Sequence, residues 1–111
     1  MSLPFEITPR EVKARLDKGE PTHLIDVREV GEHQIARIGE SELIPMRTVP
    51  AALNSLEDKA EAGVVVIFCH HGMRSLQVVN WLRQNGVEQC QSMSGGIDLW
   101  SIEIDPSVPR Y

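Results

Sequence analysis

Six consecutive apolar residues, Val64 to Cys69, form the longest apolar run in the chain and constrain its fold most strongly. A strand over Val64–Phe68 has two apolar faces, because the run does not alternate with polar residues. Such strands are typical of the centre of a parallel sheet, where helices cover both sides. The run is also far too short for a membrane-spanning helix, which needs about 20 apolar residues.

Helical and extended patterns alternate along the rest of the chain. A capping box formed by Thr8 and Glu11, with Pro9 at the first helical position, predicts a helix that ends at Gly19. Further helices are predicted over residues 49–61, 75–85 and 97–102, and further strands over residues 24–27, 43–44 and 87–93. Residues 28–41 are polar and poorly periodic, which predicts a loop, with or without one helical turn. This alternation favours the α/β class with a largely parallel sheet.

Length and charge narrow the range of partners. We expect one domain over residues 1–111, with an extended tail over residues 105–111. The 11 basic and 16 acidic residues give a net charge of −5 without a run of Lys or Arg, which argues against nucleic acid and anionic membranes. Two cysteines are too few for a disulfide scaffold, and the N-terminus lacks the pattern of a signal peptide. We therefore expect a reduced, cytoplasmic domain.

The residues that carry chemistry gather in the loop that follows the predicted central strand. Ligands bind beyond the carboxyl ends of parallel strands, and the N–H groups of a loop and helix start attract an anion there. A cysteine at this place, Cys69, is expected to exist largely as a thiolate, and Arg74 adds a fixed positive charge. Cys69 is therefore the candidate nucleophile. The candidate anion-binding loop comprises His70, His71, Gly72, Met73, Arg74 and Ser75.

The two histidines of this loop allow more than one interpretation. His70 or His71 adds partial positive charge near neutral pH, and whether they contact substrate or are plain exposed loop residues stays open. We expect neither a metal nor a cofactor, because adjacent residues seldom bind one ion together and no second pair has zinc-ligand spacing. Gly72 allows a tight turn. Cys90 lies in a predicted strand without basic neighbours and is interpreted as a packing residue.

Asp26 and Arg28 follow a second predicted strand at the same edge of the sheet. They are supporting site residues, either as a structural ion pair, which we favour, or as direct substrate contacts. Glu32 and His33 lie further along, and nothing in their spacing indicates a role.

Three segments give the chain its resemblance to the rhodanese family. They are LIDVRE at residues 24–29, VVIFCHHGMRS at residues 65–75 and SGGIDLW at residues 94–100. Their order and spacing match the family as well, so the resemblance extends over nearly the whole chain. It implies a single rhodanese-like domain with a five-stranded, mainly parallel sheet flanked by helices on both faces. One departure is Glu40, which replaces the usual glycine in the run Arg37 to Ser41 beside the family's active site, and its effect on acceptor choice stays open.

The resemblance also implies sulfur transfer through a persulfide on Cys69. The thiolate attacks the outer sulfur of thiosulfate or a related anionic donor, and the sulfur then passes to cyanide or to a thiol, protein thiols included. Two alternatives are a persulfide carrier or docking module for a specific partner protein and, less favoured, a cysteine phosphatase or arsenate reductase. Relatives of the last class have one residue more than the four between Cys69 and Arg74, because a tetrahedral oxyanion needs a wider ring of N–H donors.

Overall fold

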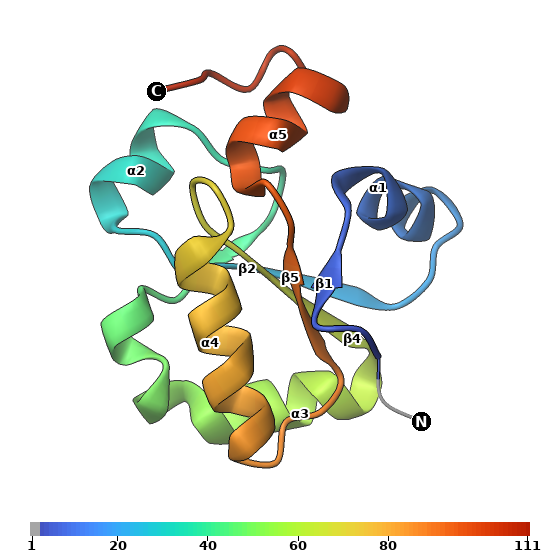
Figure 1. Cartoon of the computed structure of the whole chain (residues 1–111), viewed down its shortest axis with the longest axis vertical. Coiled ribbons are helices and arrows are strands. Elements are labelled where there is room, and N and C mark those ends of the chain that lie inside the picture. The colour runs from blue at the N-terminus through green and yellow to red at the C-terminus, as the bar shows by residue number, and fades with distance from the viewer. Residues whose placement is uncertain (1–2) are drawn as a thin grey trace.

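Five parallel strands form the sheet at the centre of the computed structural model, which describes residues 3–111 (Figure 1). Their order across the sheet is β1 (Glu6–Ile7), β5 (Cys90–Met93), β4 (Val64–Phe68), β2 (Thr22–Asp26) and β3 (Glu42–Leu43). Every pairing is parallel. The predicted α/β class is therefore confirmed, and the apolar run does form the central strand.

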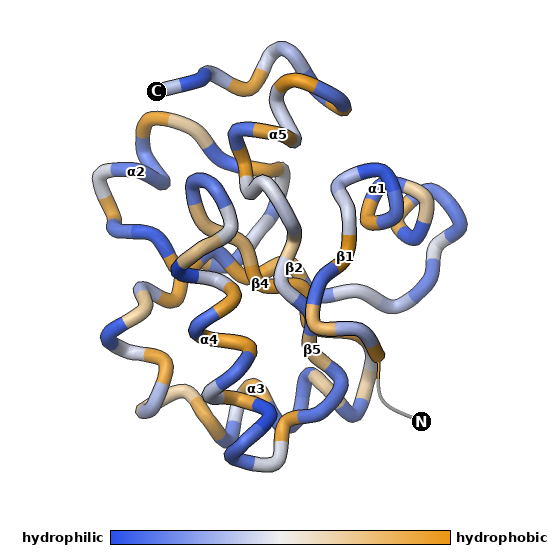
Figure 2. Tube along the Cα trace, in the orientation of Figure 1, coloured by the Kyte–Doolittle hydropathy of each residue, from blue (hydrophilic) through white to orange (hydrophobic). Residues whose placement is uncertain are grey.

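Helices cover both faces of the sheet. On one face, α3 (Leu53–Ala62) and α4 (Met73–Gln84) pack against Val65 and Ile67 of β4. On the other face, α1 (Pro9–Asp17) and α5 (Gly96–Glu103) pack against the alternate residues of β4. All five residues of β4 are buried, and Figure 2 shows hydrophobic residues along this strand inside the molecule. The two-faced burial explains why the run shows no alternation.

The first helix begins as the sequence predicts. The Thr8 side-chain oxygen accepts a hydrogen bond from the Glu11 N–H (3.1 Å), and the Glu11 carboxylate accepts one from the Thr8 N–H (3.0 Å). These two bonds satisfy N–H groups that the first helical turn leaves without partners. Gly19, with a φ of 70°, follows the end of the helix.

Several predicted boundaries are wrong. Residues 28–41 contain a six-residue helix, α2 (Val30–Ile35), which buries none of its residues and so has no apolar stripe. The helix predicted over residues 49–61 consists of a short 3₁₀ turn, Pro50–Ala52, followed by α3, and another 3₁₀ turn, Met46–Thr48, precedes it. The last strand begins only at Cys90, α4 begins two residues earlier than predicted, and α5 extends one residue further at each end. The strand predicted over residues 43–44 lies at Glu42–Leu43.

The C-terminal tail packs onto the molecule instead of extending away from it. A turn bonds the Val108 N–H to the Asp105 carbonyl (3.1 Å), and Val108 is buried in the core beneath α5. The last residue, Tyr111, then reaches α2, where its hydroxyl bonds to Glu32 (2.7 Å). Figure 1 shows the tail running back from α5 toward α2. Within residues 3–111, no helix has both the length and the apolar character that crossing a membrane requires.

Candidate active site

Cys69 lies at the carboxyl end of the central strand, where the chain turns from β4 into α4. The residue is 1% exposed. Its sulfur accepts hydrogen bonds from the Gly72 N–H (3.1 Å) and the Ser75 N–H (3.3 Å), and its S–H donates to the Ser75 hydroxyl oxygen (3.5 Å). Two backbone donors, one from the loop and one from the first turn of α4, thus converge on one sulfur atom. This arrangement favours negative charge at the sulfur or on an atom bound to it.

Two glycines permit the tight fit of this loop. Gly72 has a φ of 102° and precedes the first residue of α4, Met73. Gly96 has a φ of 62°, and a Cβ there would lie 2.5 Å from the Cys69 carbonyl oxygen and closer still to that of His70. Because Gly96 has no side chain, the Ile97 N–H reaches the Cys69 carbonyl (2.9 Å). The start of α5 therefore packs against the backbone of the Cys69 loop and fixes its position.

A second hydroxyl supports the Cys69 loop from β5. The Ser92 side-chain oxygen lies 2.7 Å from that of Ser75, and both serines are fully buried. Ser92 faces Ile67 of β4 in the register of the sheet, which brings it under the loop. Sequence reasoning missed Ser92, because a single serine in a short strand carries no local signal.

Arg74 is not free to bind an anion alone. Its guanidinium makes two bonds to the Glu32 carboxylate, at 2.8 and 3.0 Å. These hydrogen bonds raise the pKa of Arg74, and they lower the pKa of Glu32 to about 2. The sequence predicted the cation but not its partner, which comes from α2, 42 residues away along the chain. The fixed positive charge expected near Cys69 is therefore paired with a fixed negative one.

Asp26 and Arg28 form an ion pair that is closed to solvent. Both side chains have zero exposure, and two hydrogen bonds (2.9 and 2.7 Å) join the guanidinium to the carboxylate. Arg28 also donates to the carbonyl of Ala36 (2.6 Å) and to the hydroxyl of Tyr111 (2.8 Å). His33 lies 2.9 Å from Asp26 through its Nδ1 atom. These contacts tie the end of β2 to α2 and to the tail, as expected of a structural ion pair.

The two loop histidines differ in their surroundings. His70 stacks between His71 and Tyr111, with ring centroids 3.8 and 3.9 Å away. Burial, followed by the neighbouring His71, lowers the pKa of His70 below its ordinary value. His70 therefore adds no positive charge at neutral pH, whereas the side chain of His71 is 62% exposed. Met73, the other exposed loop residue, has 77% exposure.

Three possible metal ligands lie near this loop. The ligand atoms of His70, His71 and Asp98 are within 4.8 Å of one another. The two imidazoles stack on each other at an interplanar angle of 28°, and Arg110 already pairs with Asp98 at 2.8 Å. The group therefore presents no ready-made coordination geometry.

Cys90 lies far from the Cys69 loop, at the opposite end of the sheet. It begins β5, is fully buried and pairs in register with Val65 at the start of β4. Burial raises the pKa of its thiol. Both features agree with the interpretation of Cys90 as a packing residue.

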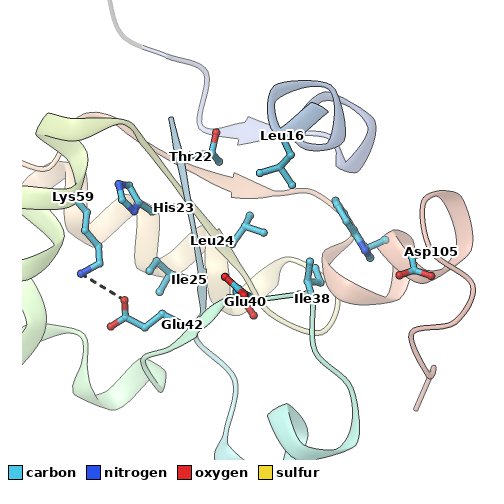
Figure 3. Close-up of a pocket in the computed structure, with 13 residues that line it drawn as sticks. Leu16, Thr22, His23, Leu24, Ile25, Ile38, Glu40, Glu42, Lys59 and Asp105 are labelled. Carbon is cyan, nitrogen blue, oxygen red and sulfur yellow. Dashed lines mark ion pairs between the residues drawn. The ribbon is translucent and has the colours of Figure 1, made fainter. Parts of the chain in front are cut away.

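A cavity of about 560 Å³ lies along the edge of β2, away from Cys69 (Figure 3). Leu16, Leu24 and Trp100 line its apolar side, and Glu40 and Glu42 line its polar side. The unusual Glu40 therefore borders this cavity, and no residue of the Cys69 loop lines it. The resemblance had led us to expect Glu40 beside the active site.

Comparisons with known proteins agree with this geometry. The family model of the rhodanese-like domain matches residues 8–103. The "Adenylyltransferase and sulfurtransferase MOCS3-1" of Zea mays is 37% identical over 109 residues, which cover 95% of this chain and 23% of that protein. The "Probable adenylyltransferase/sulfurtransferase MoeZ" of Mycobacterium tuberculosis is 30% identical over 105 residues, covering 95% of this chain and 26% of that protein. A rhodanese-like domain protein from Staphylococcus aureus has a similar crystal structure, with a TM-score of 0.80 and 31% identity over 97% of this chain and 99% of that one.

Proposed function

Because the chain belongs to the rhodanese-like domain family, we propose that it is a sulfurtransferase that carries sulfur as a persulfide on Cys69. The convergence of the Gly72 N–H and the Ser75 N–H on the Cys69 sulfur is the observation that supports this best. The chain is homologous to the sulfurtransferase part of the maize and mycobacterial proteins, and it spans about a quarter of their length.

The reaction consists of two exchanges at sulfur. The Cys69 thiolate attacks the outer sulfur of a donor such as thiosulfate, a new S–S bond forms, and the old S–S bond breaks so that sulfite leaves with the electron pair. The outer sulfur of the resulting persulfide carries the negative charge. An acceptor then attacks this outer sulfur. Cyanide takes the outer sulfur and leaves as thiocyanate, which regenerates the Cys69 thiolate. A thiolate acceptor attacks the outer sulfur of the protonated persulfide and leaves as a hydropersulfide, which also regenerates the Cys69 thiolate.

The loop donors perform the catalytic work in this scheme. They hold an anion on the Cys69 sulfur before the attack and after the second exchange, so the site needs no rearrangement between the two steps. Burial of Cys69 restricts the approach of other oxidants and electrophiles to the thiolate. The Ser75 hydroxyl donates to the Gly72 carbonyl (3.2 Å) and lies 2.7 Å from the Ser92 hydroxyl, so its position beside Cys69 is fixed.

A persulfide carrier for one partner protein is the closest alternative, and it uses the same first step. The names of the maize and mycobacterial relatives join sulfurtransferase to adenylyltransferase activity, which favours a protein acceptor in those proteins. Slow transfer to cyanide with fast transfer to one protein thiol would identify the carrier. We place either form in the cytoplasm, where Cys69 stays reduced.

A cysteine phosphatase is less favoured. Only four residues separate Cys69 from Arg74, and the Arg74 guanidinium is occupied by Glu32 at 2.8 and 3.0 Å. A phosphate ester would have to displace that carboxylate. We expect no hydrolysis of an aryl phosphate that depends on Cys69.

Intact-mass spectrometry tests the proposed function. After incubation with thiosulfate or a cysteine hydropersulfide, the mass of the protein is expected to rise by one sulfur atom. Cys69→Ser should abolish the gain, and Cys90→Ala, which removes the other cysteine, should keep it. No gain with any sulfane donor would reject the proposal.

A further inference from the structure

The cations around the Cys69 loop are matched by carboxylates. Arg74 pairs with Glu32 (2.8 Å), and Arg28 pairs with Asp26 (2.7 Å). Next to the loop histidines, Arg110 pairs with Asp98 (2.8 Å). The lowered pKa of His70 leaves its imidazole neutral at neutral pH.

This pairing limits what the site offers to an incoming anion. The net charge of the chain is −5, so its long-range field repels an anionic donor. The Gly72 and Ser75 N–H groups are already used by the Cys69 sulfur. A donor with two negative charges must therefore approach a thiolate and the Glu32 carboxylate without an unpaired cation to offset them.

We propose that Glu32 makes the site select sulfur donors of low negative charge, such as hydropersulfides of small thiols or proteins, over the dianion thiosulfate. The inference rests on the proposed sulfurtransferase function and adds the class of the donor. Glu32 acts through charge, by neutralising Arg74, and is a specificity-determining residue that does not touch the reacting sulfur.

The hydropersulfide step is balanced without a further reactant. The Cys69 thiolate attacks the terminal sulfur of the donor R–S–SH, the S–S bond of the donor breaks, and the thiolate R–S⁻ leaves. Cys69 then carries the group –S–SH, whose proton passes to the departing thiolate. The products are the Cys69 persulfide anion and the thiol R–SH.

The test compares two donors on the same protein sample. Mass spectrometry measures the second-order rate constant of persulfide formation with thiosulfate and with cysteine hydropersulfide, at low ionic strength. Glu32→Gln keeps the shape of the side chain but leaves the charge of Arg74 unpaired. The ratio of the thiosulfate to the hydropersulfide rate constant is expected to rise roughly fivefold, from Coulomb attraction of a dianion at close range in water.

Two further variants keep the result interpretable. Glu20→Gln makes the same change in net charge at the far end of the sheet, where Glu20 pairs with Arg15, and it should leave the ratio within twofold. Arg74→Gln leaves the Glu32 carboxylate unpaired and should lower the ratio, which provides the test if Glu32→Gln does not fold. A structural defect slows both donors and leaves the ratio unchanged.

The outcomes separate the two proposals. If persulfide forms on the wild type but neither variant changes the ratio, the role of Glu32 is rejected and the sulfurtransferase function stands. If neither donor loads the wild-type protein, the proposed function itself fails.

Discussion

Replacement of Gly96 by alanine is expected to damage the fold and the Cys69 loop together. The residue has a φ of 62°, and an alanine in this left-handed region costs roughly 1–2 kcal/mol. The added Cβ would lie 2.5 Å from the Cys69 carbonyl oxygen, so α5 and the loop must separate. That separation breaks the bonds from Ile97 to Cys69 (2.9 Å) and from Asp98 to His70 (3.1 Å), each worth about 1 kcal/mol. The free energy of unfolding should therefore fall by about 3–4 kcal/mol.

A second glycine provides the control for backbone strain alone. Gly86 has a φ of 95°, and a Cβ there would meet nothing within 4 Å. Gly86→Ala should cost only the conformational part, roughly 1–2 kcal/mol. Equilibrium urea unfolding measures the loss of unfolding free energy in both variants, provided that the dependence of the free energy on urea concentration is the same as in the wild type. The rate of Cys69 alkylation by iodoacetamide reports on the position of the loop. If Gly96→Ala costs no more than Gly86→Ala and leaves the alkylation rate unchanged, contact between α5 and the loop does not position Cys69.

Three further predictions concern charge and hydrogen bonding at the site. Arg74 lowers the pKa of Glu32 from its ordinary 4.5 to about 2, so this pair stabilises the fold fully above about pH 4.5 and loses its contribution as the pH falls toward 2. In Glu32→Gln, the free energy of unfolding should lack this pH-dependent contribution, on the order of 2 kcal/mol. If its stability falls with acid as steeply as that of the wild type, the pairing of Glu32 with Arg74 does not lower the pKa of Glu32. The thiosulfate loading rate of the wild type should rise with inert salt, because salt screens the repulsion from a chain of net charge −5, and a clear fall would count against it. Ser92→Ala should slow Cys69 alkylation at neutral pH roughly two- to fivefold by removing a bond to the Ser75 hydroxyl, whereas Ser101→Ala, at another buried serine, should leave the rate unchanged.

The parts of the fold that depend on local sequence could be predicted. Burial on both faces determines the composition of β4, and a capping box determines the start of α1, so both patterns are visible in a few adjacent residues. The loop of Cys69 could be predicted for the same reason, because its strand, glycine and helix start are contiguous. The start of α4 was placed two residues late, since Gly72 and Met73 also suit a loop.

The parts that depend on tertiary contact could not be predicted. The helix α2 buries no residue, and its start is capped by Glu29 and Glu32, whose capping box lacks the usual Ser or Thr. Glu32 reaches Arg74 across 42 residues, and Ser92 reaches Ser75 only through the register of β4 and β5. No pattern in a single sequence encodes these distances. As a result, the sequence predicts the candidate nucleophile and its loop, but not the partners that set their charge and orientation.

The separation of the two cysteines has a consequence for oxidative damage. Cys90 pairs with Val65 at the start of the central strand. Cys69 lies four residues beyond Val65, so at the rise of a β-strand about 13 Å separates the levels of the two cysteines along the strand direction. A disulfide requires Cα atoms within about 7 Å, so Cys90 is not a resolving cysteine for Cys69. A sulfenic acid on Cys69 therefore depends for its repair on a thiol from outside the domain. The external thiols that accept sulfur in the proposed reaction are suited to this rescue.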